Sequence, residues 1–288
     1  MNLRFSGHDT FHCKQQWLLK GTRLIEEIGI NEFHNTSEAI KFLGVGKNMV
    51  SSVRYWLESF NITSGNCITE VGKKVLGDNG LDPYLEDEGT LWLLQYYLCN
   101  NKYASIFNII FSEYFADKVS YEFNENKVLN FLNKYISDNG LKPISSNTLS
   151  TDFKVFIRSY VSSIKENKTL EDDFNSPLLE LGLVEMIDKE LYKLNKVNRN
   201  IPIHIFAYSV LDVADKEDKQ NLSFRLLQET LGNYFCLTND SLEEHIYQLK
   251  DVSNLFVYNE DGGTANIQIK SNTLEERNYI LEQHYETH

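Results

Sequence analysis

The densest group of side chains able to do acid–base or metal chemistry lies near the N-terminus of this 288-residue chain. His8 and Asp9 are adjacent there, and Arg4 or Lys14 is close enough in sequence to stabilise charge on a phosphate. A carboxylate beside an imidazole suits a general base or a metal ligand, so we take His8 and Asp9 as candidate catalytic residues. The alternative, which we favour, is structural: residues 7–10 form a turn in which Asp9 or Thr10 caps the first helix.

Acidic side chains ahead of an apolar segment form a second candidate site. Asp82, Glu86, Asp87 and Glu88 offer the hard oxygen ligands that suit Mg²⁺ or Mn²⁺, but their spacing follows no known metal-binding loop. Carboxylates in this position also stabilise the positive end of a helix for which Thr90 is an acceptable cap, and we favour this interpretation. Mg²⁺ or Mn²⁺ is the expected cofactor, and no metal ligands are assigned.

Other catalytic patterns find no match in the sequence. Asp152, Lys154 and Arg158 are spaced i, i+2 and i+6, so one helical stripe cannot hold all three. The segment LGVGKN is too short for a phosphate-binding GxxxxGK loop, and neither GxSxG nor HExxH occurs, so we expect no nucleotide cofactor. The four cysteines are scattered without a CxxC pair, which argues against a zinc site and against disulfides.

The charge distribution separates the N-terminal part of the chain from the rest. The formal net charge is -13, from 28 Lys and Arg against 41 Asp and Glu. Residues 1–80 hold nine basic and eight acidic side chains, so this part carries +1 and the remainder -14. Because neutralisation of phosphates supplies most non-specific affinity for nucleic acid, the N-terminal part is the better suited to DNA.

Residues 36–76 have the pattern of a winged helix-turn-helix. Two short helices flank a glycine turn at residues 44–46, and an earlier helix over 14–29 precedes them. The chain then turns and runs extended before another short helix, which is the layout of a small wing. The expected elements are helices over 36–43 and 47–60, a turn over 63–66, an extended segment over 67–72 and a helix over 73–76.

The helix over 47–60 is the predicted DNA reader. Its apolar side chains recur at helical spacing, while its other side is small, polar or basic, as a helix in the major groove requires. Side chains in the first turn of such a helix are best placed to meet phosphates and base edges. The expected DNA-binding residues are Lys47, Asn48, Ser51, Arg54 and Tyr55. The alternative is an ordinary amphipathic core helix with solvated charges.

The expected fold class is mainly α with small β wings. Apolar segments of helical length occupy the middle of the chain. A second winged-helix-like pattern follows Pro177, and the pattern near the C-terminus predicts a hairpin with its turn at residues 261–263. Polar stretches over 138–151 and 165–177 are the expected linkers. The predicted domains are a winged helix-turn-helix over 1–80, a helical core over 81–164, and a C-terminal helical domain with winged-helix-like features over 165–288.

The apolar residues are spread rather than gathered into one long run. No window reaches the roughly 18 consecutive apolar residues that a membrane helix needs. The N-terminus also lacks an apolar run behind a basic start, which a secretory signal would require. We therefore expect a cytoplasmic protein that has no membrane partner.

Four separated blocks of sequence resemble a known family. They occur in the order FSGHDTF, LGVGKNMVSSVRYW, DPYLEDEGTLWLL and DDFNSPLLELGLVE, and together they span most of the chain. These blocks are similar to the family catalogued as domain of unknown function 4007. The family prefers Glu where this chain has Asp9, and an arginine after the first block where this chain has Cys13 and Lys14.

The resemblance implies a role in bacterial DNA phosphorothioation and phage defence. Family members are similar to the component of Ssp-type systems that nicks DNA so that sulfur can replace a non-bridging phosphate oxygen. The implied partners are DNA, a cysteine desulfurase, a sulfurtransferase related to phosphoadenosine phosphosulfate reductases, an ATPase and a second copy of the chain. We expect a DNA-binding component, and we favour a nicking endonuclease as its activity. The alternative is a non-catalytic DNA-binding adaptor or transcriptional regulator.

Overall fold

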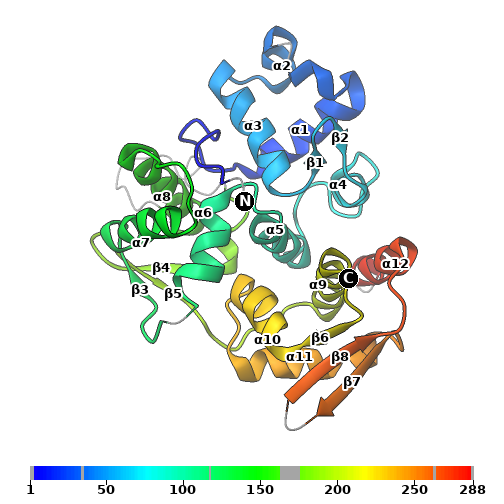
Figure 1. The fold of residues 1–288 in the computed structure, drawn as a ribbon. Helices are drawn as coiled ribbons and strands as arrows, with labels where there is room; N and C mark the ends of the chain where they lie inside the picture. The colour runs from blue at the N-terminus through cyan, green and yellow to red at the C-terminus, as the bar shows by residue number, and fades with distance from the viewer. Residues whose placement is uncertain (1–2, 34–35, 117, 163–175, 262–263, 287–288) are drawn as a thin grey trace. The chain divides into compact units, whose positions relative to one another are not determined.

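A computed structural model of the chain describes residues 3–33, 36–116, 118–162, 176–261 and 264–286. The chain divides into two compact units, Met1–Asn195 and Lys196–His288. Helices dominate both units and the strands form small antiparallel sheets, so the mainly α fold class is confirmed (Figure 1). Within the described ranges, no helix has both the length and the apolar content that crossing a membrane requires.

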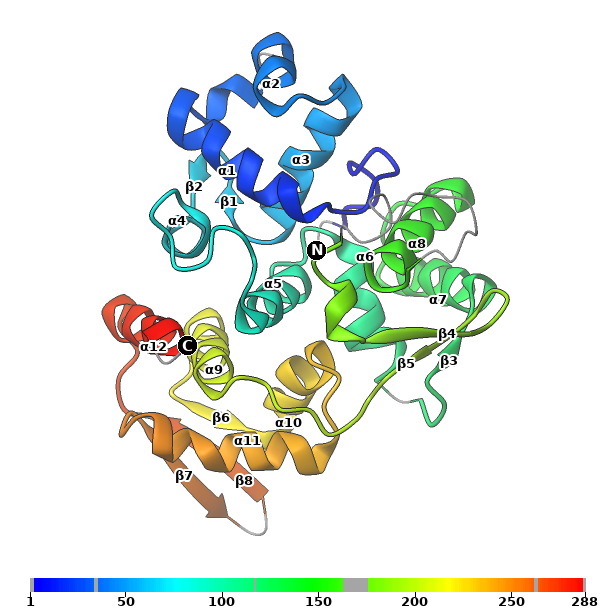
Figure 2. The same cartoon turned by 180° about the vertical axis from the view of Figure 1, so that it is seen from behind.

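The N-terminal part of the first unit holds four helices and a short hairpin (Figure 2). Its elements are α1 (Gln15–Ile28), a 3₁₀ helix (Ile30–Phe33), α2 (Thr36–Leu43), α3 (Lys47–Ser59), β1 (Thr63–Ser64), β2 (Cys67–Ile68) and α4 (Glu70–Leu76), so the four longer helices are α-helices. The first three α-helices confirm the predicted ones. Helices α1 and α3 pack closely at Gly21, where a Cβ would lie 2.8 Å from a Leu57 methyl carbon and 2.9 Å from a Val53 methyl carbon. A larger residue there would push the two helices apart.

The hairpin between α3 and α4 is shorter than the predicted wing. Its strands pair over two residues each, Thr63 with Ile68 and Ser64 with Cys67. The extended segment ends early because Thr69 caps α4, its side-chain oxygen accepting a hydrogen bond from the Gly72 amide at 3.0 Å. Helix α4 therefore begins at Glu70, whereas the sequence pattern predicts a start at residue 73.

A helical core forms the rest of the first unit. Its elements are α5 (Glu88–Asn100), α6 (Ser105–Asn108), a π-helix (Ile109–Tyr114), α7 (Glu125–Asp138) and α8 (Ser146–Tyr160). Residues 89–99 of α5 are all buried, which explains their apolar and aromatic composition. Phe107, Phe111, Phe156 and Tyr160 pack with ring centroids 5.2 to 6.1 Å apart. Because Ser145 caps α8, this helix begins inside the predicted linker over 138–151.

A three-stranded sheet joins the helical core to residues beyond the predicted second linker. Strand β5 (Leu191–Leu194) lies between β3 (Glu122–Phe123) and β4 (Val184–Asp188) and pairs antiparallel with both. These strands belong to one sheet, so β4 and β5 group with the core and the boundary between units follows Asn195. Most of the predicted linker over 165–177 lies outside the described residues.

The second unit is built around another three-stranded sheet. Its elements are α9 (Ile203–Glu217), β6 (Asn221–Ser223), α10 (Phe224–Leu227), a π-helix (Gln228–Gly232), α11 (Asn239–Val252), β7 (Phe256–Asp261), β8 (Thr264–Ile269) and α12 (Leu274–Glu286). The predicted terminal hairpin is confirmed by the pairing of β7 with β8, although its turn residues 262–263 lie outside the described part. Strand β8 also pairs with β6 and is therefore central. The winged-helix assignment for the C-terminal region stays a prediction.

Candidate nucleic-acid interface

Helix α3 presents a polar stripe on its exposed side. Lys47, Asn48, Ser51 and Arg54 are exposed, while most of the remaining helix is buried. Lys47, Ser51 and Arg54 are spaced i, i+4 and i+7, so they follow one line along the helix. Gly46 occupies the N-cap and supplies no side-chain acceptor for the amides of the first turn. The stripe therefore combines two cations, two neutral polar groups and a positive helix end, which suits a phosphate backbone.

Tyr55 lies away from this stripe, so the expectation that it faces DNA is wrong. Its side chain is only 2% exposed because it is rotated about 100° around the helix from Arg54, toward the N-terminal segment. Its ring packs edge-on against His8, with centroids 5.5 Å apart. Burial raises the pKa of the Tyr55 hydroxyl, and the charge of Asp152 raises it further. Tyr55 holds α3 against the N-terminal segment.

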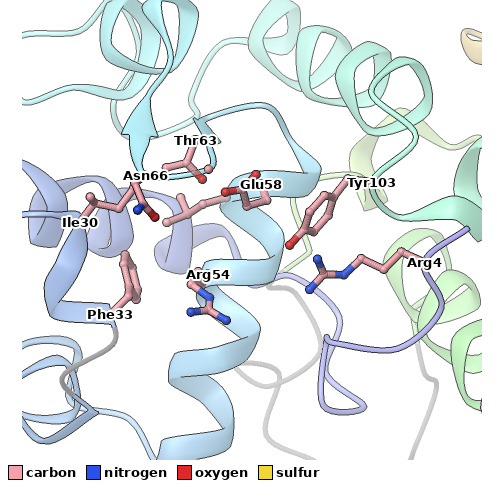
Figure 3. Close-up of a pocket in the computed structure, with 10 residues that line it drawn as sticks. Arg4, Ile30, Phe33, Arg54, Glu58, Thr63, Asn66 and Tyr103 are labelled. Carbon is pink, nitrogen blue, oxygen red and sulfur yellow. The ribbon is translucent and has the colours of Figure 1, made fainter. Parts of the chain in front are cut away.

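A pocket opens beside the C-terminal half of the stripe (Figure 3). Its volume is about 230 Å³, and its lining includes Arg54 from α3, Arg4 from the N-terminal segment, and Tyr103. The guanidinium carbon of Arg4 lies 4.1 Å from the centroid of the Tyr103 ring, a cation–π contact. The backbone amide of Arg4 donates to Ser105 Oγ at 2.8 Å, which fixes the start of this side chain. The pocket thus brings together two arginines that are 50 residues apart in sequence.

Glu58 forms an acidic wall of the same pocket, one turn of α3 beyond Arg54. Burial raises the pKa of its carboxyl, while hydrogen bonds from the Gly65 amide and the Thr63 hydroxyl act in the opposite direction. These bonds attach the β1–β2 hairpin to α3. Glu58 was not among the sequence-predicted site residues, because a single acidic residue on a helix gives no pattern to distinguish it.

His8 is buried against a residue far away in the sequence. Its Nε2 lies 3.0 Å from Asp152 Oδ1, and the two side chains are 2% and 1% exposed. The Thr10 amide donates to His8 Nδ1 at 3.1 Å, so the ring proton lies on Nε2 and is donated to Asp152. Asp152 Oδ1 also accepts the Ser6 amide at 2.9 Å. Both ring nitrogens are therefore occupied and the ring is buried, and the catalytic role expected of His8 stays a prediction.

The loop from Ser6 to Thr10 is held in a conformation that most residues avoid. Ser6, Asp9 and Thr10 have φ angles of 70°, 43° and 67°, in the left-handed region. Arg158 stabilises the loop from α8, its Nη2 donating to the Thr10 carbonyl at 2.6 Å. Asp9 is exposed and lies apart from the α1 N-cap, which is Lys14. The predicted turn is present, but the predicted capping by its side chains is wrong.

The acidic residues before α5 bind backbone amides. Asp87 caps the helix by accepting the Thr90 amide at 3.3 Å, and the nearly buried Asp82 accepts the amides of Glu86 and Asp87 at 2.9 and 3.1 Å. The capping interpretation is confirmed for the carboxylates, but the N-cap is Asp87 and not the expected Thr90. Across the part of the chain that the structure describes, His, Cys, Asp and Glu form no group of three able to hold a metal ion. No ligands of a Mg²⁺ or Mn²⁺ ion are therefore assigned among the described residues.

Comparison with known proteins identifies a matching family and two solved structures with a similar fold. Residues 5–285 match the family described as "Protein of unknown function (DUF4007)". No curated protein shows a significant match to the chain. Two solved structures, described as "Magnesium ion-bound SspB crystal structure" and "SspB crystal structure", each share 21% identity with it at a TM-score of 0.85. Each alignment covers 99% of this chain and 88% of the other, so the shared fold extends over the whole chain.

Proposed function

This chain belongs to the DUF4007 family, and from that premise we propose that it is a DNA-binding component of a bacterial DNA phosphorothioation system. The observation that carries the proposal is the exposed stripe of Lys47, Asn48, Ser51 and Arg54 on α3. It lies in the part of the chain that carries +1, while the remainder carries -14. The likeness of the fold to SspB supports the choice of pathway.

The stripe suggests how DNA is bound. Helix α3 enters the major groove, with Lys47 near a phosphate and the longer, forked side chain of Arg54 at a guanine or a second phosphate. Asn48 and Ser51 hydrogen-bond to base edges or sugar oxygens between them. The acidic remainder of the chain repels the duplex from other surfaces, which favours this orientation.

Wild-type protein is expected to bind a duplex in a strongly salt-dependent way, because counterions are released from each neutralised phosphate. Fluorescence anisotropy with a labelled duplex, measured over a range of NaCl concentrations, gives log K against log salt. With at least two phosphate contacts, the slope should be about -2 or steeper. A duplex that shows no binding even at low salt would refute the DNA-binding proposal.

A finer proposal concerns the reaction. We propose that the chain nicks one strand so that sulfur can replace a non-bridging oxygen, working with a cysteine desulfurase, a phosphoadenosine phosphosulfate reductase-like sulfurtransferase and an ATPase, and as a homodimer. This proposal rests on the family resemblance. Of the two expected catalytic residues, His8 is buried and Asp9 is exposed, so Asp9 is the one able to meet a strand directly. The alternative is a non-catalytic adaptor or regulator that delivers DNA to these partners.

Supercoiled plasmid distinguishes the two proposals. Wild-type protein incubated with Mg²⁺ or Mn²⁺ is expected to produce nicked circles, visible by agarose electrophoresis. Asp9→Ala should slow this reaction by about 100-fold or more if Asp9 moves a proton or holds the metal. Asp138→Ala, an exposed acidic residue at the end of α7, is the matched control and should nick at the wild-type rate. Wild-type protein that leaves the plasmid intact under both metals would favour the adaptor.

A further inference from the structure

We propose that the pocket beside α3 holds one unpaired DNA nucleotide, with its phosphate at Arg4 and Arg54 and its base toward Glu58. The inference rests on the proposed DNA binding and adds the class of DNA that the site prefers. Arg54 belongs both to the exposed stripe and to the pocket lining. A duplex bound along the stripe therefore passes the mouth of the pocket, and a nucleotide released from base pairing can enter it.

The phosphate would lie between two guanidinium groups. Arg4 and Arg54 both line the pocket and come from different segments of the chain, the N-terminal segment and α3 (Figure 3). Arg4 is held there through the face of Tyr103, and no ion pair among the described residues involves it. Guanidinium groups donate two parallel hydrogen bonds to phosphate oxygens, so this pair suits a phosphodiester.

Glu58 argues against a lone phosphate as the occupant. Its carboxylate would repel an anion that filled the pocket, yet it is fixed in the lining by the Thr63 hydroxyl and the Gly65 amide. A nucleotide resolves this conflict because its phosphate and base lie at opposite ends of a sugar. Adenine, cytosine and guanine carry exocyclic amino groups able to donate to a carboxylate, whereas thymine does not.

The size and walls of the pocket also suit one nucleotide. Its volume of about 230 Å³ lies below the range of roughly 300–1,000 Å³ found for pockets of drug-sized ligands, so the open pocket encloses at most one nucleotide, and part of that nucleotide stays outside the mouth. Tyr103, which is half-buried, provides an aromatic ring in the lining, whereas Phe33 and Leu57 also line the pocket but are buried, at 5% and 0% exposure. A base separated from its stack needs an accessible ring of this kind to replace part of the lost stacking.

Binding to two labelled DNAs of equal length tests the proposal. One is a perfect duplex and the other carries a single unpaired adenine, replaced by 2-aminopurine in a parallel fluorescence measurement. The wild type is expected to bind the second DNA at least about fivefold more tightly. Arg4→Ala and Tyr103→Ala should both lose this preference. Arg225→Ala removes an exposed arginine in the second unit and should behave like the wild type.

Two further comparisons identify what enters the pocket. An unpaired thymine should gain less affinity than an unpaired adenine, and Glu58→Gln should reduce this difference. Inorganic phosphate, compared with chloride at equal ionic strength, should leave the preference for the unpaired adenine unchanged. A free phosphate ion in the pocket is repelled by the Glu58 carboxylate and therefore does not compete. Equal affinity for the two DNAs, or a preference that survives in Arg4→Ala and Tyr103→Ala, overturns the pocket proposal while leaving duplex binding intact. Absence of all DNA binding overturns both proposals.

Discussion

Replacing Lys47 and Arg54 together by alanine is expected to weaken duplex binding about 30-fold or more. An arginine that contacts a guanine contributes about 1–3 kcal/mol, and each lost phosphate contact lowers the salt slope by about one unit. The two side chains are exposed on one stripe of α3, so their removal leaves the buried face of the helix intact. Anisotropy titrations at several salt concentrations measure both quantities.

The control for this variant must lose the same charge elsewhere. Lys134→Ala with Lys193→Ala removes two exposed cations from α7 and β5 of the same unit and leaves the net charge equal to that of the test variant. Its duplex affinity should stay within about threefold of wild type, because these cations do not belong to the stripe. If the control loses as much affinity as the test variant, binding depends on overall charge and α3 is not the reader.

Asp152→Ala is expected to destabilise the first unit by about 3 kcal/mol. The substitution leaves the buried His8 Nε2 and the partly buried Ser6 amide without an acceptor; an unsatisfied buried donor costs about 1–3 kcal/mol, and a partly buried one costs less. Chemical denaturation followed by tryptophan fluorescence measures the change, because Trp17 and Trp56 lie in the N-terminal part. Asp138→Ala, with an exposed side chain, is the matched control and should change stability by less than about 0.5 kcal/mol.

A double-mutant cycle shows whether the pair itself is responsible. His8→Ala should also destabilise the protein, and the double variant should cost less than the two single costs together, since the side chains contact each other. Additive effects, or an Asp152→Ala variant as stable as wild type, would contradict the role assigned to this pair. The stability readout also separates positioning from catalysis, because a purely catalytic His8 would leave unfolding unchanged.

The elements near α3 were predictable because their signals are local. The glycine turn and the apolar spacing of residues 47–60 define α3, and its exposed residues follow from the helical period. The period also explains the error at Tyr55, since residue 55 lies between the buried and the exposed stripes and only the neighbouring segment decides which side it joins. That segment contains His8, whose own position depends on Asp152.

Long-range contacts account for most of what the sequence did not reveal. Asp152 is 144 residues from His8, and the spacing around it on α8 argued against a site. The pocket likewise combines Arg4, Arg54 and Tyr103, which share no sequence motif. The same holds for the three-stranded sheet of the first unit, in which β3 pairs with β5 although α7 and α8 lie between these strands in the sequence. Such pairings depend on tertiary packing, which local periodicity does not encode.

The attachment of the N-terminal loop to α8 has a consequence for synthesis on the ribosome. Arg4 and His8 emerge before Asp152, which binds His8 and the Ser6 amide and follows 144 residues after His8. At about 5–20 residues per second, the loop waits on the order of ten seconds for Asp152. The helices over 15–59 can form during this interval, whereas the segment that carries Arg4 reaches its final conformation only after α8 has been made. Completion of the N-terminal region is thereby coupled to synthesis of the helical core.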